Sequence, residues 1–368
     1  MQVLERLSVA PEASWYALHG DHQGQAERYV VTTPQGRAIC NRPELLGVDF
    51  NESMHDGMTA ALRTAPFKDL IAGHPETGVC VLNFLRGGLN FEIRRALHTA
   101  YGFNRHSSAF MSSQRFRDAA GRWGVKEDMY RKLDFPPDAV LVMGDVVATG
   151  VTMEHGLAVI LDHLVELGSS ARALVFFTIG CHKAEKVLED LDVKLRAAFP
   201  AYERTILVYL ESKFRLVDSQ TPLRIGIPGT DLIRRGAFMT PELEASQYDD
   251  AAALMERCVI YDAGSRAFDI PHYCEDVVEY WEQVAGHARE GWTLREALEE
   301  RWPERLRGTE EEFLALRRGS WRGVDDAEIR GLYEQLAAFW ARPAGSRELA
   351  ELCAARLAVL RAAGGLER

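Results

Sequence analysis

Short apolar runs alternate with helix-periodic stretches through the middle of the chain. Four runs predict buried strands, at residues 78–85, 139–143, 173–179 and 205–210, and 258–261 is a fifth candidate. Helical patterns lie at about 89–100, 152–167 and 183–197. Near-continuous apolar strands joined by helices indicate a parallel sheet with helices on both faces and right-handed crossovers. We therefore expect an α/β fold with a doubly wound, Rossmann-like sheet.

The two ends of the chain carry other patterns. Residues 28–33 and 37–40 flank a Pro34-Gln35-Gly36 turn, which predicts a hairpin, and a helix is expected near 51–64. From about 275 onward the sequence is charged, rich in Leu and Ala, and helix-periodic. We expect an N-terminal α+β extension or hood over 1–75, an α/β core over 76–270 and a helical region over 271–368.

Composition and charge exclude several classes of protein. The 368 residues carry a formal net charge of −11, which disfavours nucleic acid as a general partner. The sequence has no signal-peptide pattern and no apolar stretch long enough to span a membrane. Its six cysteines are scattered, without a CxxC pair, so we expect reduced thiols, no structural zinc and a cytoplasmic location.

Residues 139–152, AVLVMGDVVATGVT, carry the clearest candidate chemistry. An apolar strand leads through Asp145 into small residues and then into a helix. Backbone N–H groups in such a loop converge on an anion, and the helix N-terminus adds partial positive charge. Thr149 and Thr152 can donate hydrogen bonds to phosphate oxygens, and Asp145 can accept them from sugar hydroxyls. A turn without function is the alternative for a shorter match of this kind.

This segment resembles the signature of type I phosphoribosyltransferases. In that signature an apolar strand ends in two acidic residues, followed by two aliphatic residues, a small residue, Thr, Gly, any residue, and Thr or Ser. The resemblance assigns ribose and 5-phosphate binding to Asp145, Val147, Ala148, Thr149, Gly150, Val151 and Thr152. The segment lacks the lysine of a Walker A loop and the GxGxxG of dinucleotide folds, which disfavours both of those classes.

The sequence departs from the signature at Gly144, where the family has its first acidic residue. In the family both acids approach the ribose hydroxyls, often through Mg²⁺. The resemblance therefore makes Asp145 the candidate catalytic and metal-ligating residue and Mg²⁺ the expected cofactor. With Asp145 alone, we expect the hydroxyl and metal contacts to be weaker or to be supplied from elsewhere.

A second strand and turn, residues 81–89, lies upstream. Consecutive glycines let backbone N–H groups approach an anion, and an arginine can form forked bonds to a diphosphate. The segment resembles the pyrophosphate loop of uracil phosphoribosyltransferases, which implies diphosphate binding by Arg86, Gly87 and Gly88 and a catalytic role for Arg86. The alternative is a helix N-terminus with an ordinary surface arginine.

Two further segments complete the resemblance. Residues 102–134 are polar and basic without clear period, which predicts a long loop or lid. There Arg105 and Lys132 match positions of the uracil branch and join the diphosphate-binding set; the alternative is a solvated surface loop.

Residues 225–231, IGIPGTD, loosely resemble the base-binding segment, which implies acceptor contacts by Gly229, Thr230 and Asp231. A Pro-Gly turn whose Asp caps a helix is the alternative.

The resemblance covers residues 78–240 or so and implies a glycosyltransferase. A nitrogen of a pyrimidine-like or other heterocyclic base would displace diphosphate from phosphoribosyl diphosphate, and the protein would supply positioning and electrostatic stabilisation. A non-catalytic regulator that binds phosphoribosyl diphosphate or a nucleotide, and a hydrolase on a similar sheet, are the alternatives. A homodimer is the default expectation.

Overall fold

The fold is taken from a computed structural model of the chain. The structure describes residues 2–20, 24–85, 87–117, 123–256, 264–302 and 308–366, and within 113–129 it describes only the backbone of 113–117 and 123–129.

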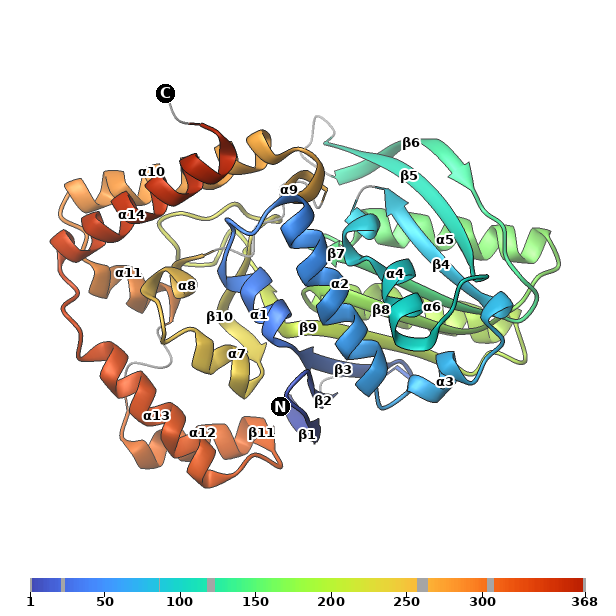
Figure 1. Cartoon of the computed structure of the whole chain (residues 1–368), viewed down its shortest axis with the longest axis horizontal. Coiled ribbons are helices and arrows are strands. Elements are labelled where there is room, and N and C mark those ends of the chain that lie inside the picture. The colour runs from blue at the N-terminus through green and yellow to red at the C-terminus, as the bar shows by residue number, and fades with distance from the viewer. Residues whose placement is uncertain are drawn as a thin grey trace.

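One mixed, mostly parallel sheet runs through the described part of the chain (Figure 1). Its strands lie in the order β11-β1-β2-β3-β9-β8-β7-β4-β5-β6, and β10 pairs with β9. The strands from β3 to β5 in this order are parallel. The bounds are β1 Val3–Val9, β2 Ser14–His19, β3 Glu27–Thr32, β4 Val79–Leu85, β5 Ser107–Arg117, β6 Trp123–Lys132, β7 Ala139–Val147, β8 Ala171–Gly180, β9 Arg204–Leu216, β10 Leu232–Met239 and β11 Trp321–Arg322.

Helices cover both faces of this sheet, as the sequence predicts. Helices α1 (Pro34–Asn41), α2 (Gly47–Thr64), α3 (Lys68–Ala72) and α4 (Ile93–Tyr101) lie on one face. Helices α5 (Val151–Glu166) and α6 (His182–Ala198) lie on the other (Figure 1). The chain leaves β4 through α4 toward β5, but it leaves β7 through α5 in the opposite direction, toward β8 and β9. The doubly wound α/β prediction is confirmed at this level.

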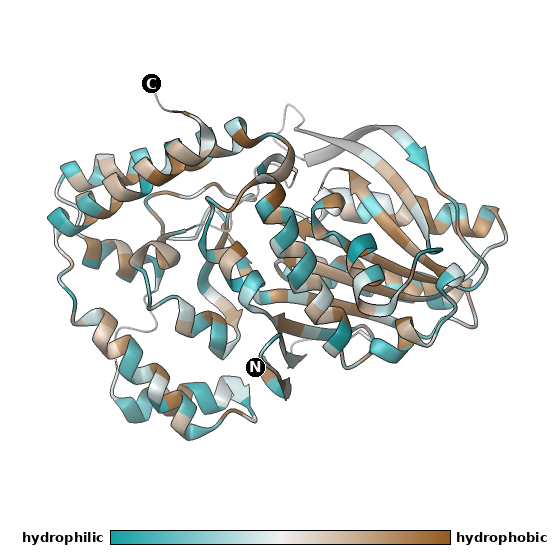
Figure 2. Cartoon of the chain, viewed as in Figure 1, coloured by the Kyte–Doolittle hydropathy of each residue, from teal (hydrophilic) through white to brown (hydrophobic). Residues whose placement is uncertain are grey.

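The middle strands are apolar because both of their faces are covered. Ala139, Val140 and Val142 of β7 and most of β8 have essentially no exposed surface. Figure 2 shows hydrophobic residues concentrated along these strands. Burial on both faces explains why continuous apolar runs marked them in the sequence.

The predicted hairpin over residues 28–40 is wrong in its second half. Residues 27–32 form β3, but Pro34 then begins α1 instead of a turn. Thr33 caps this helix, since its Oγ1 accepts a hydrogen bond from the N–H of Gly36 at 2.9 Å, and proline is favoured in the first helical turn. Strand β3 pairs with β2 and β9, so β1–β3 continue the sheet of the core.

The predicted lid over 102–134 is a β-hairpin, not a loop. Strand β5 pairs along β4 from Ser107 to Ser112, and β6 returns antiparallel to β5. A strand near the edge of a sheet needs no continuous apolar run, which is why the sequence showed no period there. The candidate strand 258–261 lies outside the described residues.

The region predicted as helical, 271–368, is mainly helical in its described residues and also contains the short strand β11. The helices from residue 241 onward are α7 Pro241–Ser246, α8 Ala251–Met255, α9 Ser265–Phe268, α10 Ile270–Arg289, α11 Leu294–Arg301, α12 Glu310–Ser320, α13 Asp326–Trp340 and α14 Ser346–Gly364. Helices α10 and α14 pack side by side (Figure 1). Within the described ranges, no helix combines the length and apolar character needed to cross a bilayer.

Candidate functional site

The two predicted phosphate-binding segments meet between β4 and β7, where the crossover connections turn to opposite sides of the sheet. Strands β4 and β7 are parallel neighbours, paired from Val79–Val140 to Leu82–Met143. Their crossovers leave in opposite directions, and ligands of open α/β sheets bind outside the carboxyl ends of the strands at such points. This placement follows from the topology alone and does not depend on the family resemblance.

The cradle after β7 is a short turn that opens onto a helix N-terminus. Gly150 is the N-cap of α5 and has φ +78°, which glycine adopts without strain. No side chain of the described residues caps this helix, so the first-turn N–H groups remain open to an anion. Val147 and Ala148 are buried below the turn, whereas Thr149, Val151 and Thr152 are half-buried around it.

Asp145 lies at the carboxyl end of β7 and is 9% exposed. Its Oδ1 accepts a hydrogen bond of 2.7 Å from the N–H of Val146, which orients the carboxylate on the strand. Asp145 and the residues from Val147 to Thr152 thus lie together at the carboxyl end of β7, and their binding of ribose and 5-phosphate stays a prediction.

Gly144 is a glycine because a phenylalanine fills the space beside it. A Cβ atom at this position would lie 2.4 Å from Cγ of Phe91, a residue with no exposed surface at the end of the 3₁₀ turn Gly87–Phe91. A Cβ at Gly88 would lie 3.2 Å from the carbonyl oxygen of Gly144. The turn after β4 is therefore packed directly onto β7, and an acidic side chain at 144 has no room.

Gly87 and Gly88 are buried in this turn, next to the cradle strand. Arg86 lies outside the described residues. The close packing of Gly88 against β7 explains by itself why this position is a glycine, so no bound ligand is needed to explain it. Diphosphate binding by this turn stays a prediction.

Arg105 does not lie with the cradle. It precedes β5 and so sits at the amino edge of the sheet, where its backbone N–H and Nε bind the carboxylate of Glu76. Its side chain is 75% exposed, and the length of β4 separates it from the carboxyl edge by about 20 Å. The assignment of Arg105 to diphosphate binding is wrong, because parallel strands begin at the edge opposite to the one that binds ligands.

Lys132 is also displaced from the turn after β4. Along the sheet, Asn83 of β4 is level with Phe110 of β5 and with Lys132 of β6. Lys132 is exposed and lies two strands, about 10 Å, from β4. Beyond Ser112, which pairs with the last residue of β4, strand β5 continues to Arg117, so the hairpin rises past the carboxyl edge beside the site.

The segment predicted to meet the acceptor base is a tight turn between β9 and β10. Gly229 has φ +78° and donates its N–H to the carbonyl of Val217 at 2.8 Å. Asp231 has no exposed surface, and its Oδ2 accepts a hydrogen bond of 2.8 Å from the N–H of Ile227. The acceptor role of Asp231 is therefore wrong; its carboxylate closes the Pro-Gly turn, which leads into a strand and not a helix. Thr230 is half-buried beside it.

Cys181 follows β8 beside the cradle. Burial raises the pKa of its thiol to about 11, and its Sγ contacts the carbonyl oxygen of Ala148 at 3.2 Å. A buried thiol of this kind is a structural group and not a nucleophile.

The residues at the site do not fit a resident metal ion. Asp145 is a single acid where the family pattern has two, and Phe91 closes the space beside Gly144. No group of three or more His, Cys, Asp or Glu side chains able to hold a metal occurs within the described ranges.

Phe91, Thr178 and Lys183 lie around the cradle and were not singled out in the sequence. Thr178 and Lys183 flank the end of β8, so the rule that ligands bind at carboxyl ends of parallel strands is the signal that could have found them. No model of a protein family matches the chain, and no curated protein matches it. The function must therefore be argued from the site.

Proposed function

We propose that this protein transfers the 5-phosphoribosyl group of phosphoribosyl diphosphate to a nitrogen of a pyrimidine-like or related heterocyclic base. The observation that carries the proposal is the position of the β7–α5 cradle. It lies beside the glycine turn of β4, at the switch point of the sheet, with Asp145 at the strand end. This is where an α/β protein would hold a phosphorylated sugar.

The proposed reaction is a displacement at C1 of the ribose. A base nitrogen would form a bond to C1 while the bond from C1 to the diphosphate oxygen breaks, and the proton of that nitrogen would pass to the departing diphosphate. Open N–H groups at the start of α5 and the hydroxyls of Thr149 and Thr152 would hold the 5-phosphate. Asp145 would accept hydrogen bonds from ribose hydroxyls, and the β5–β6 hairpin would exclude water. Such a reaction needs positioning and charge stabilisation but no covalent nucleophile.

Mg²⁺ belongs to this proposal as part of the substrate. Bound to the diphosphate, it would neutralise charge on the leaving group.

A specific observation favours a second candidate, a non-catalytic protein that binds phosphoribosyl diphosphate or a nucleotide. Phe91 closes the space at Gly144, so the strand end offers the sugar one carboxylate instead of two. A site of this composition can still bind the 5-phosphate, because the cradle does not depend on residue 144.

Release of diphosphate distinguishes these functions. The protein is incubated with phosphoribosyl diphosphate, Mg²⁺ and each of a panel of heterocyclic bases, and diphosphate is measured. Release that depends on one base supports the transferase, and release without any base indicates a hydrolase. Binding without turnover favours the regulator, and the absence of both binding and turnover contradicts the proposal. Arg105→Gln is the matched control, since this arginine lies at the opposite edge and its loss should leave turnover unchanged.

A further inference from the structure

The first turn of α6 lies against the cradle. A Cβ placed on Gly150 would be 3.5 Å from Cβ of Lys183 and 3.4 Å from Cγ2 of Val187. Helix α6 begins directly after β8, so its first turn and the first turn of α5 stand next to each other at the carboxyl edge of the sheet.

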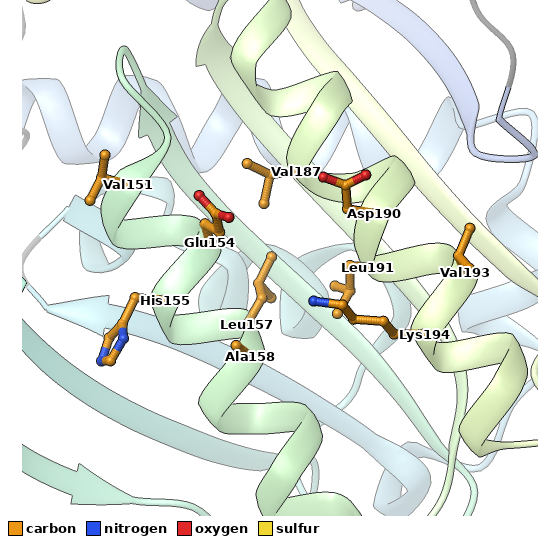
Figure 3. A pocket seen from close by; sticks show the side chains of 10 residues that line it. All are labelled: Val151, Glu154, His155, Leu157, Ala158, Val187, Asp190, Leu191, Val193 and Lys194. Atoms are coloured by element: carbon orange, nitrogen blue, oxygen red, sulfur yellow. The ribbon is translucent and has the colours of Figure 1, made fainter. Parts of the chain in front are cut away.

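Lys183 belongs to the face of α6 that is turned toward α5. Residues of both helices line a groove between them, and α6 contributes Val187, Asp190, Leu191, Val193 and Lys194 (Figure 3). Lys183 precedes Val187 by one turn and so continues this face toward the cradle. Helical side chains lean toward the helix N-terminus, which directs Lys183 toward the end of the groove where α5 begins.

A buried hydroxyl faces the same corner. Thr178 of β8 is paired in register with Asp145 and has no exposed surface. Its Oγ1 has no hydrogen-bond partner in the described part of the chain. This oxygen lies 2.7 Å from where a Cβ of Gly180 would be, so it points along the strand toward the carboxyl edge. Buried polar groups are nearly always paired, so this hydroxyl next to Gly180 calls for a partner that the described residues do not supply.

The charge of Lys183 also has no partner in the described part of the chain. The neighbouring Lys186 pairs with Asp190 at 3.0 Å and the buried Lys213 pairs with Glu185 at 2.8 Å. Among the described residues the ammonium of Lys183 makes no ion pair or hydrogen bond, and the residue is exposed. Partial burial, and then the charges of Lys183 and Lys213, lower the pKa of His182, while the charge of Glu185 opposes this shift.

We propose that Lys183 is a binding residue for the phosphate monoester held at the start of α5, and that α6 forms the second wall of the cradle. The inference rests on the proposed function, which places the 5-phosphate of the sugar at this point. A lysine acts on a phosphate as a mobile point charge, so the ammonium can follow the anion without a fixed geometry.

Binding of ribose 5-phosphate, measured by calorimetry at fixed ionic strength, tests the inference. Lys183→Gln should raise Kd about tenfold or more, as expected for a hydrogen bond to a charged group. Lys186→Gln removes the same charge from the next turn of the same helix and should change Kd less than about twofold. Lys183→Arg should retain most of the affinity. Both lysines are exposed, and equal melting temperatures would show that the variants fold alike.

The outcomes separate this inference from the proposed function. If the unaltered protein binds ribose 5-phosphate and Lys183→Gln binds it as well as Lys186→Gln does, the role of Lys183 is overturned and the cradle stands. If the unaltered protein does not bind ribose 5-phosphate, both the phosphate-binding role of the cradle and the role of Lys183 are contradicted.

Discussion

Asp145 is the residue on which the proposed chemistry depends most directly. Asp145→Asn keeps an oxygen that can accept the N–H of Val146 but removes the negative charge offered to the sugar. We expect base-dependent diphosphate release to fall at least about tenfold, because hydrogen bonds to a charged group are worth roughly 1.5–3 kcal/mol, while the melting temperature changes little. Asp162→Asn, an exposed carboxylate on α5, is the control. Unchanged turnover in Asp145→Asn would remove Asp145 from the mechanism.

Glu211 is a buried acid of a different kind, outside the cradle. It is 1% exposed, has φ +68°, and accepts hydrogen bonds from Oγ1 of Thr32 at 2.5 Å and the N–H of Thr33 at 2.7 Å. Burial raises its pKa to about 8, against the opposing hydrogen bonds from Thr32 and Thr33 and the charge of Arg37. A glutamic acid in the unfolded chain titrates near pH 4.3. Between these values the unfolded chain releases a proton that the folded protein keeps.

The stability of the protein should therefore fall as the pH rises through this window. The contribution of protonated Glu211 is complete below about pH 4 and is lost progressively as the pH approaches 8, the reverse of an ion-paired carboxylate. Relative to Glu211→Gln, which cannot ionise, the unaltered protein should lose roughly 3 kcal/mol of unfolding free energy between pH 5.5 and 8. Urea titrations of both proteins at the two pH values measure this difference. Parallel pH profiles would show that Glu211 ionises normally.

At the scale of elements, the contact between β7 and the turn after β4 can be tested by adding a methyl group at residue 144. Gly144→Ala places a Cβ against the ring of Phe91 and should cost about 1–3 kcal/mol, the usual penalty of overpacking. Gly331→Ala on α13 is the matched control, because no atom lies within 4 Å of its added Cβ. This control should gain up to about 1 kcal/mol from helix propensity.

A double-mutant cycle with Phe91→Ala isolates the contact. Shortening Phe91 opens the space that the methyl group added by Gly144→Ala needs, so the two substitutions together should cost at least about 1 kcal/mol less than their sum. If the losses of unfolding free energy from the two substitutions simply add, the ring of Phe91 does not limit the size of the residue at 144.

The elements that the sequence predicted are those whose signal is local. Strands β4, β7, β8 and β9 are buried on both faces and so read as apolar runs, and the cradle follows from one continuous segment. The sequence missed α1 because Thr33 was interpreted as the end of a strand and Pro34-Gln35-Gly36 as a turn, whereas Thr33 caps the helix that Pro34 begins. It missed β5 and β6 because strands near an edge lack such runs.

Site residues from separate segments were predicted less well. Arg105 and Asp231 were assigned from the resemblance of their own segments to the family, whereas their positions depend on where strands begin and how a turn closes. Phe91 and Lys183 meet the cradle from elements that are its neighbours only in space. No periodicity or motif within one segment reports such contacts.

At the scale of the whole molecule, arginines attach the C-terminal helices to the N-terminal ones. Arg266 of α9 donates to three backbone carbonyls, those of Ile39 at 3.0 Å, Arg42 at 2.6 Å and Leu45 at 2.8 Å. Arg356 of α14 forms an ion pair with the carboxylate of Glu44 at 2.9 Å. The forked guanidinium suits this role because it presents several donors in a fixed geometry.

Arg266→Lys should therefore destabilise the protein although it keeps the charge. A single ammonium cannot satisfy three separated carbonyls, and we expect a loss of about 1–3 kcal/mol in urea unfolding. Arg361→Lys, which alters an exposed pair with Glu282, should change stability by less than about 0.5 kcal/mol. Equal effects of the two substitutions would show that the carbonyl contacts contribute nothing beyond charge.

The pairing of β1 with β11 has a consequence during synthesis of the chain. Leu4 pairs with Trp321, 317 residues later, and Arg6 binds Glu328 at 2.6 Å. At about 5–20 residues per second, the open edge of β1 waits roughly 15–60 s for its partner to leave the ribosome. An unpaired strand edge is a template for association with other chains. Nascent chains that end before residue 321 should therefore expose the edge of β1 at Leu4 and Glu5, the two residues that β11 later covers.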